Sequence, residues 1–228
     1  KTAFHLVRTG RPGPVLIDLP RDVQENEAAF RYPDAVSLPG YRPTLRGHGG
    51  MIKRAAELIN KVARPLIVAG RGVVLSQAYD ELRQLAEQAQ IPVVTTLMGI
   101  GAFPSTHPLA CGMVGMHGLP CANLAVNHAH LIIAIGTRFS DRSIGRASDF
   151  ASQAQVIHID IDPAEIGKNV GVKVPIVGDV RAVLASLLTE VAPTQRSAWL
   201  EQVEEWRNQY RLTVRETAEL LPQHVIGA

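Results

Sequence analysis

Short runs of apolar residues recur along the chain and alternate with longer segments in which apolar residues appear every three or four positions. The clearest runs are Leu131–Ile135 and Val156–Ile161, which are rich in isoleucine and valine. Runs of this length and composition are typical of strands that are buried on both faces of a parallel sheet. Similar runs predict further strands at residues 15–19, 66–69, 91–96 and 174–177.

The segments between these runs predict helices. Ile52, Ala55 and Ile59 would share one face of a helix at about residues 51–61, which is the spacing of an amphipathic helix. Ser76 is the expected N-cap of the next helix. After a short helix that carries Ala3, Phe4 and Val7, the expected helices are at about residues 51–61, 79–88, 121–129, 181–191 and 197–221.

The order of these elements predicts the fold class. Strands alternate with helices at least five times, so we expect an α/β fold built on a doubly wound parallel sheet with right-handed crossovers. Residues 103–120 are rich in glycine, methionine and histidine and follow neither period. They therefore predict a long loop, and long loops inside compact domains are usually functional.

Changes in composition divide the chain. Residues 21 to about 50 are polar and contain Pro33, Pro39 and Pro43, which is typical of an interdomain linker. The part of the chain before this segment holds only the short helix and the strand predicted at 15–19. One helix and one strand cannot form a sheet alone, so the chain is expected to be a piece of a longer protein. The expected parts are the end of one domain at 1–23, a linker at 24–50, a central domain at 51–192, a linker helix at 193–221 and the start of another domain at 222–228.

The composition is that of an ordinary globular protein, with 46% hydrophobic and 19% charged residues among 228. A net charge of +2 gives no reason to expect a nucleic acid or an anionic membrane as partner. No apolar run approaches the roughly 20 residues of a membrane helix. Cys111 and Cys121 match no zinc or redox spacing, which indicates either a reducing compartment such as the cytoplasm or a role in packing alone.

Small and polar residues follow the apolar runs, at the points where strands would leave the sheet. In open α/β sheets, ligands bind beyond the carboxyl ends of the strands, so these residues are candidates for holding a nucleotide-like ligand. Gly70-Arg71-Gly72 follows the strand at 66–69. Glycines there would let backbone N–H groups approach a phosphate. Without the rest of the dinucleotide fingerprint, however, Gly-x-Gly is more often an ordinary tight turn.

Charged residues follow the two clearest strands. Arg138 and Arg142 could hold a pyrophosphate through forked hydrogen bonds, with Asp141 orienting them; they could equally form a solvated charge cluster. Asp160 lies where an acid commonly accepts hydrogen bonds from ribose hydroxyls. Asp162-Pro-Ala-Glu165 could extend that acidic site or form an N-cap and capping box that open a short helix.

The histidines carry weaker signals. His117 lies in the long loop and could contact a planar ring, although a loop histidine is more often simply exposed. His128 and His130 form a His-x-His pair, but on a helix end they would point to different sides, which argues against a metal site. No nucleophile with its base and no pair of catalytic carboxylates emerges. We therefore assign no catalytic residue and no metal ligand, and the pattern favours a binding domain.

Several longer motifs give the chain a specific resemblance. They are GRPGPVLIDLPRDVQ at 10–24, LPGY at 38–41, PVVTTLMGIGAFP at 92–104, GMVGMHG at 112–118, GTRFSDR at 136–142, VIHIDIDPAEIGKN at 156–169 and VGDV at 177–180. In these motifs the chain resembles the middle portion of acetolactate synthase (acetohydroxyacid synthase) catalytic subunits, which are thiamine diphosphate enzymes. The resemblance implies the Rossmann-like central domain of that family.

The resemblance also implies an activity and its cofactors. Such enzymes condense two 2-oxo acids, pyruvate with pyruvate or 2-oxobutanoate, with decarboxylation, in branched-chain amino-acid biosynthesis. They use thiamine diphosphate and Mg, and they are homo-oligomers, dimers or tetramers, that can bind a regulatory small subunit. Their central domain binds FAD, which has no redox role in the net reaction. By resemblance, the flavin contacts would be Gly70, Arg71, Gly72, Thr96, Leu97, Met98, Gly115, Met116, His117, Gly136, Arg138, Asp141, Arg142, Asp160, Ile161, Asp179 and Val180.

Two positions depart from the family pattern. Members usually have three consecutive glycines where this chain has Arg71 in the middle, and a side chain there would either crowd the pyrophosphate or turn away and add positive charge. An arginine a few residues after LPGY often contacts the cofactor, but Thr44 holds that place, and Arg42 or Arg46 could substitute. An FAD-independent acetolactate synthase therefore stays open as the parent.

The sequence leaves the parent protein open in two more ways. The parent could be glyoxylate carboligase or sulfoacetaldehyde acetyltransferase, and the chain could instead be a non-catalytic nucleotide-binding module. The thiamine diphosphate site of the family needs a GDG motif, which the sequence does not contain, and a glutamate in the pyrimidine-binding domain. We therefore expect the chain by itself to be inactive.

Overall fold

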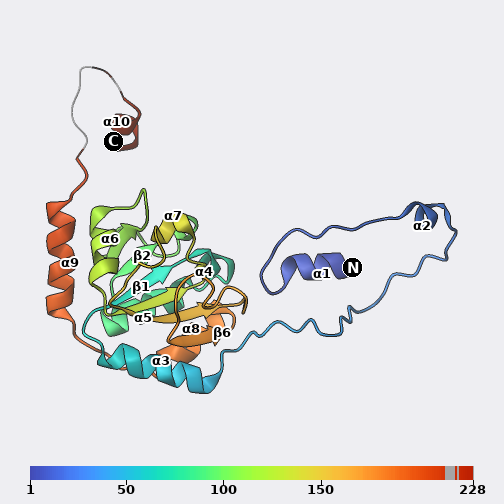
Figure 1. Cartoon of the computed structure of the whole chain (residues 1–228), viewed down its shortest axis with the longest axis horizontal. Coiled ribbons are helices and arrows are strands. Elements are labelled where there is room, and N and C mark those ends of the chain that lie inside the picture. Colours follow the sequence, from blue (N-terminus) through green and yellow to red (C-terminus); the bar gives the residue numbers. More distant parts are fainter. Residues whose placement is uncertain (214–218, 220, 228) are drawn as a thin grey trace.

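A single parallel sheet lies at the centre of the computed structural model, in which residues 1–213, 219 and 221–227 are described (Figure 1). Its strands in the described residues are β1 (Pro65–Ala69), β2 (Val93–Thr95), β3 (Ala110–Met113), β4 (Leu131–Ile135), β5 (Gln155–Asp160) and β6 (Val174–Val177). Their order across the sheet is β3-β2-β1-β4-β5-β6, and every neighbouring pair is parallel. This order is that of doubly wound dinucleotide-binding folds, so the predicted fold class is confirmed.

Helices cover both faces of the sheet (Figure 1). One face packs against α3 (Gly49–Lys61), α5 (Tyr79–Ala89) and α8 (Val180–Leu188), and the other packs against α6 (Pro120–His128) and α9 (Ser197–Gln209). Successive side chains of a strand point to opposite faces. Ile67 and Ile133 therefore join the first hydrophobic cluster, whereas Leu66 and Ile132 join the second. This explains why the strands read as continuous apolar runs.

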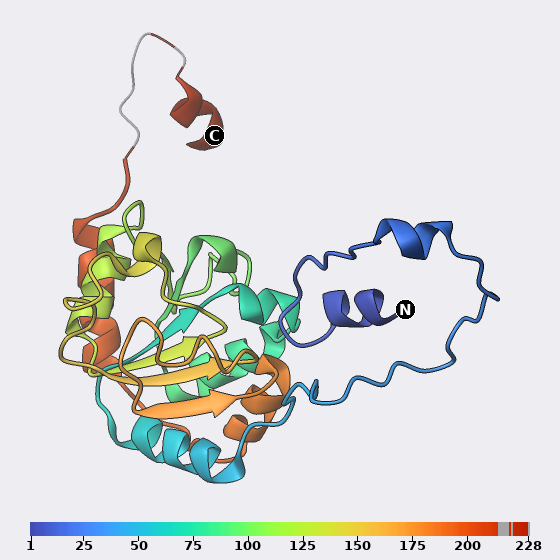
Figure 2. The ribbon, with the colours of Figure 1, turned by 45° about the vertical axis from the view of Figure 1, so that its right-hand side comes forward.

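Shorter elements complete the described part of the chain. They are α1 (Thr2–Arg8), α2 (Arg21–Glu25), α4 (Arg71–Leu75), the 3-10 helix η1 (Leu97–Gly99), α7 (Asp141–Ile144) and α10 (Pro222–Gly227). The predicted short helix near the N-terminus is thus confirmed as α1. Residues 1–44 extend from one side of the sheet domain (Figure 2). None of the helices in the described residues is both long and apolar enough to cross a membrane. The division of the chain into domains stays a prediction.

The strand predicted at residues 15–19 is wrong. The segment has no regular secondary structure, and Leu16 and Ile17 are exposed to solvent. A strand needs a neighbour to accept and donate its backbone hydrogen bonds, and none of the strands in the described residues lies beside this segment. Its β-branched composition alone therefore does not produce a strand.

The loop predicted at 103–120 contains the strand β3, which the sequence pattern missed. β3 is an edge strand with the sequence Ala-Cys-Gly-Met, and its pairing with β2 shifts register between Val93 and Val94. A glycine-containing edge strand that pairs on one side only carries little β propensity. Its pairing with β2, not its composition, makes it a strand.

Two helix predictions need correction. Ser76 does not cap α5, because α4 occupies the residues after β1 and Ser76 ends that helix instead. The Ser76 hydroxyl accepts a hydrogen bond from the Arg181 backbone N–H at 2.9 Å. The linker helix expected to reach residue 221 ends at Gln209, one turn after Trp206, whose ring contacts His128 and Trp199. Residues 214–218 and 220 of that prediction lie outside the described residues.

Candidate functional site

The carboxyl ends of the six strands meet along one edge of the sheet, because all strands are parallel. The structure places all of the predicted cofactor contacts at the ends of these strands or in the loops and first helical turns that follow them. β1 is followed by Gly70, Arg71 and Gly72; β2 by Thr96, Leu97 and Met98; β3 by Gly115, Met116 and His117; β4 by Gly136, Arg138, Asp141 and Arg142; β5 ends at Asp160, before Ile161; and β6 is followed by Asp179 and Val180. Their contact with a ligand stays a prediction.

The loops after β1 and β4 pack backbone against backbone at the centre of this edge. The N–H of Gly70 donates to the Ile135 carbonyl at 2.9 Å, and the N–H of Gly72 donates to the Gly136 carbonyl at 3.0 Å. A Cβ on Gly70 would lie 2.3 Å from the Gly136 oxygen, so glycine is required there. Both N–H groups are engaged inside the protein, which favours the tight-turn interpretation of these glycines over direct phosphate binding. Arg71, between them, is exposed.

Two further glycines allow equally close contacts between neighbouring loops. A Cβ on Gly99 would lie 2.2 Å from the Ala69 oxygen, and one on Gly115 would lie 2.3 Å from the Arg142 oxygen. The side chain of Asn123 also accepts from the Gly115 N–H at 2.9 Å and donates to its carbonyl at 3.1 Å. These contacts hold the loops after β2 and β3 close to the carboxyl ends of the strands. The sequence analysis did not identify Asn123 as part of this arrangement.

Large apolar side chains and cationic side chains lie exposed along the same edge. Leu97, Met98 and Met116 are each more than half exposed, at 67%, 56% and 63%. Exposed apolar side chains gathered in one place commonly mark a binding surface. Arg138 and Arg142 are exposed as well, so the edge offers apolar contact and positive charge together.

The charge cluster after β4 is loosely held. The Asp141 carboxylate accepts from the Arg142 backbone N–H at 2.9 Å, and its other oxygen lies 4.0 Å from the Arg142 Nε. The Arg142 guanidinium also donates to the Met116 sulfur at 3.7 Å. Exposed ion pairs of this kind contribute little stability. Within the described residues Asp141 contacts Arg142 and not Arg138, so it can orient only one of the two arginines.

Asp160 occupies a confined position at the end of β5. Its carboxylate is largely buried and accepts a hydrogen bond from the Asp162 N–H at 2.9 Å. Burial disfavours the charged form and raises the pKa of Asp160, although the Asp162 N–H acts in the opposite direction. The predicted capping box does not form, because Asp162 accepts from Ala164 at 3.0 Å and the Glu165 side chain binds Arg11 instead. The segment forms turns and no helix.

The residues after β6 have structural roles in this arrangement. Asp179 caps α8, since its carboxylate accepts from the Ala182 N–H at 3.1 Å. The Asp179 N–H donates to the Leu45 carbonyl at 2.9 Å, which brings the segment with Thr44 and Arg46 to this edge. The Val180 side chain is buried in the core.

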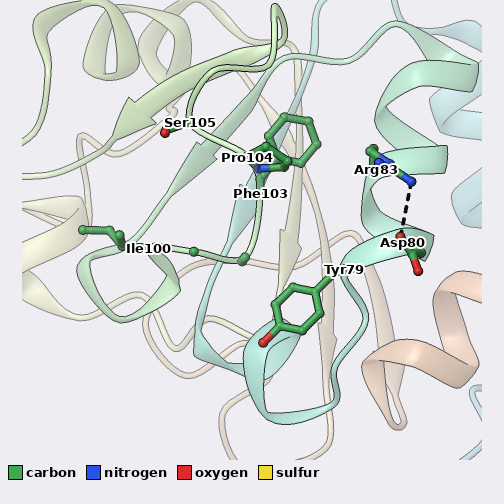
Figure 3. A pocket seen from close by; sticks show the side chains of 9 residues that line it. Tyr79, Asp80, Arg83, Ile100, Phe103, Pro104 and Ser105 are labelled. Carbon is green, nitrogen blue, oxygen red and sulfur yellow. Dashed lines mark hydrogen bonds and ion pairs between the residues drawn. The ribbon is translucent and has the colours of Figure 1, made fainter.

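Figure 3 shows a cavity of about 420 Å³ between the start of α5 and the loop after η1. Its walls include Tyr79, Ile100 and Phe103. Arg83 donates to Asp80 at 3.3 Å beside it. None of the predicted cofactor contacts lines this cavity, so it is distinct from the candidate site.

The described residues contain no group of three or more His, Cys, Asp or Glu side chains placed to hold a metal ion. His128 ends α6, where its ring contacts the Leu124 carbonyl and Trp206. Cys111 and Cys121 are unpaired and buried. Burial raises the pKa of Cys111 to about 12, so its thiol is a poor nucleophile.

Comparison with known proteins places this arrangement in context. Residues 52–187 match the family model described as the thiamine pyrophosphate enzyme central domain. A probable acetolactate synthase large subunit of Methanocaldococcus jannaschii is 53% identical over 211 residues, which cover 90% of this chain and 36% of that protein. The acetolactate synthase large subunit of Corynebacterium glutamicum is 50% identical over 204 residues, covering 90% of this chain and 32% of that protein.

A third relative agrees with these two. An acetolactate synthase of Mycobacterium bovis is 44% identical over 232 residues, covering 98% of this chain and 38% of that protein. The chain therefore spans about a third of the length of the curated relatives that it matches.

Proposed function

Since this chain belongs to the thiamine pyrophosphate enzymes as their central domain, we propose that it is the FAD-binding domain of an acetolactate synthase large subunit. The observation that carries this proposal is the strand-end edge, where every predicted flavin contact gathers at the carboxyl ends of six parallel strands. Relatives that are 44–53% identical carry the name acetolactate synthase, which favours this parent over the other thiamine diphosphate enzymes.

The side chains at this edge suit a long anionic cofactor with a planar ring. The exposed Leu97, Met98 and Met116 offer apolar contact to a ring system. Arg138 and Arg142 can neutralise a diphosphate through forked hydrogen bonds. Asp160 is placed to accept from ribose hydroxyls, as acids at this position of such folds commonly do. Because the glycines hold the loops close to the sheet, the cofactor would lie across the loops rather than between them.

The complete protein would supply the rest of the reaction. We propose that it condenses two 2-oxo acids with decarboxylation in branched-chain amino-acid biosynthesis, using thiamine diphosphate and Mg bound by segments outside this chain. FAD would take no redox part in the net reaction. The residues of this chain would bind and orient the flavin. We propose a homo-oligomer with a regulatory small subunit in the cytoplasm, in keeping with two unpaired cysteines.

Titration of the chain with FAD, followed by flavin fluorescence, tests the site. We expect saturable binding with a Kd weaker than about 1 µM, because the flavin of this family also touches neighbouring domains. Replacing Asp160 by alanine removes the ribose acceptor and should weaken binding about tenfold, the effect of one lost hydrogen bond to a charged group.

A control replaces Asp34 by alanine, which removes an exposed carboxylate from the N-terminal segment that extends beside the sheet domain (Figure 2) and should leave the Kd unchanged. Absence of saturable binding up to about 1 mM FAD would contradict the flavin site. Equal binding by the chain and its D160A variant would remove Asp160 from the site, and binding tighter than about 1 µM would show that neighbouring domains contribute little.

A further inference from the structure

Two side chains hold three consecutive backbone carbonyls in the segment that follows β4. His158 Nε2 donates to the Thr137 carbonyl at 2.7 Å. Asn169 Nδ2 donates to the carbonyls of Arg138 at 3.0 Å and Phe139 at 3.1 Å. His158 lies on β5 and Asn169 lies in the loop that follows β5. All three carbonyls therefore face the β5 side of the segment.

This arrangement decides where the N–H groups of the segment point. In a trans peptide, the N–H points away from the carbonyl of the same peptide group, and the described residues contain no cis peptide bond. The N–H groups of Arg138, Phe139 and Ser140 consequently face away from His158 and Asn169. In the part of the chain that the structure describes, none of these three N–H groups has a protein acceptor.

Phe139 makes this conformation unusual and shows that it is held from two sides. Its φ is +50°, a left-handed backbone conformation that residues other than glycine rarely adopt. Its ring is buried, with centroid distances of 5.0 Å to His158 and 5.6 Å to Phe150. His158 supports the ring while Asn169 holds the carbonyl, so both contacts offset the cost of the backbone conformation.

From these contacts we propose that Asn169 and His158 are positioning residues for the diphosphate of the bound dinucleotide. They turn the segment 137–140 so that its N–H groups and the Arg138 side chain meet the diphosphate at the strand-end edge. Both act through the backbone of the segment. This inference rests on the proposed flavin site, which it deepens by assigning the diphosphate to this segment.

A role of Asn169 in stability alone makes a different prediction. In that case, loss of its amide would loosen the loop after β5 and lower the unfolding temperature, but flavin affinity would stay the same. The positioning role requires the conformation of the segment and flavin affinity to change together. Asn169 is exposed, so its replacement should not prevent folding.

The test uses Asn169→Asp in the full chain. The aspartate has the shape of asparagine but brings a negative oxygen, without a donor, against two carbonyl oxygens. Without ligand, we expect trypsin to cleave after the exposed Arg138 about tenfold faster, measured by mass spectrometry. In FAD titrations we expect the Kd to rise about tenfold. Each effect corresponds to the loss of about two hydrogen bonds. Asn169→Gln keeps the amide donor, so its cleavage rate after Arg138 and its Kd for FAD should both stay close to those of the unaltered chain.

The matched control is Asn60→Asp. Asn60 also joins two segments through its side chain, donating to the Glu190 carbonyl at 3.4 Å and accepting from the Ala192 N–H at 3.0 Å, but it lies on α3, away from the strand ends. The Asn60→Asp variant should have a lower unfolding temperature, while its cleavage rate after Arg138 and its Kd for FAD should stay unchanged.

The outcomes separate this inference from the proposed function. If the unaltered chain binds FAD and the N169D variant binds it equally well, the positioning role is wrong, whether or not cleavage after Arg138 changes. If N169D weakens FAD binding without faster cleavage after Arg138, the backbone route is wrong. If the unaltered chain does not bind FAD, the proposed function fails, and the assignment of the diphosphate fails with it.

Discussion

His158 is the residue whose chemistry depends most on its burial. It has no solvent exposure and lies within β5. Its Nε2 donates to the Thr137 carbonyl, and its Nδ1 has no hydrogen-bond partner among the described residues. A donor is needed at Nε2, so the neutral ring carries its proton there. Burial lowers the pKa of His158, although the Thr137 carbonyl and the nearby Asp160 oppose the shift. The histidine is therefore neutral in the folded protein near neutral pH.

This burial predicts a loss of stability in mild acid. The pKa of His158 is lower in the folded than in the unfolded chain, where it is about 6.5, so below about pH 6.5 the unfolded state binds more protons. The free energy of unfolding should fall as the pH drops through this value, by at most about 1.4 kcal/mol per pH unit. Urea unfolding at several pH values between neutrality and mild acid measures the slope.

The His158→Gln variant supplies the comparison. Glutamine can donate to the Thr137 carbonyl but does not titrate. The difference in the free energy of unfolding between the unaltered chain and the variant should therefore shrink or reverse as the pH falls. Asp160 acts in the opposite sense, because its raised pKa favours the folded state as the pH falls. Both proteins contain Asp160, so the comparison reports the titration of His158 together with its interaction with Asp160. Parallel pH profiles for the two proteins would contradict the assignment to His158.

At the scale of elements, Arg196 joins the ends of two helices. It precedes α9 and is buried, and it donates to the carbonyls of Val62 at 3.2 Å and Ile59 at 2.5 Å at the end of α3, and to that of Ala89 at the end of α5. Carbonyls at helix C-termini lack donors within the helix, and the helix dipole favours a cation there. Burial lowers the pKa of Arg196, but an arginine stays charged in proteins.

Replacing Arg196 by methionine should strongly destabilise the fold. The methionine fills similar space but leaves two buried carbonyls and one partly buried carbonyl without their donor, so we expect a loss of about 3 kcal/mol in the free energy of unfolding. Arg196→Lys should lose less, because the ammonium can still donate to one or two of the carbonyls. Chemical unfolding measures both. The control is Arg54→Met, an exposed position on α3, where the change should stay within about 0.5 kcal/mol; equal losses at both positions would refute the helix-end role.

The edge strand β3 shows why some elements form only in the folded protein. Arg207 of α9 donates to the carbonyls of Pro108 at 2.8 Å and Ala110 at 2.9 Å, beside the unpaired side of β3. An edge strand leaves backbone groups without a neighbour, and this arginine satisfies the first carbonyl of β3 and one that lies just before the strand. The partner of these groups lies about a hundred residues away in the sequence, which local patterns cannot reveal.

At the scale of the whole molecule, Arg11 connects residues 1–44 to the sheet domain. Its guanidinium lies 3.1 Å from Asp162 and 2.5 Å from Glu165 in the loop after β5. Burial alone would raise the pKa of Glu165, but Arg11 and Lys168 together outweigh it and hold that pKa below its usual value. Among the described residues, these are the ion pairs that reach from the N-terminal segment to the sheet domain. The same loop carries Asn169, so the two contacts restrain it from opposite ends.

Removal of Arg11 should loosen this loop without unfolding the domain. In Arg11→Ala we expect backbone amides at 162–168 to exchange with deuterium several-fold faster, since a contact worth about 1 kcal/mol is lost, while amides of β1 and β4 exchange as before. Hydrogen exchange with mass spectrometry measures this. Arg21→Ala removes the exposed pair with Glu25 inside the N-terminal segment and should leave the loop unchanged; similar exchange in all three proteins would contradict the restraint.

Local pattern alone determined most of the central fold. The strands β4 and β6 appear at the predicted residues, and β1 and β5 within one residue. The strands β1, β4 and β5 are buried on both faces, which requires a nearly continuous apolar run. The same pattern placed the candidate residues at strand ends, and parallel pairing brings those ends to one edge. The motifs indicated the family, which the match at 52–187 confirmed. These features depend on residues that lie close together in the sequence.

Only the tertiary structure decided which backbone N–H and carbonyl groups form hydrogen bonds and with which partners. The segment 15–19 has strand composition but no neighbouring strand in the part of the chain that the structure describes, whereas β3 has little propensity and pairs with β2. The N–H groups of Gly70 and Gly72 bind carbonyls from another loop, and Asn169 reaches carbonyls about thirty residues away. Backbone groups take whichever partner the fold brings within about 3 Å. That choice is made by contacts between distant segments, which no local pattern encodes.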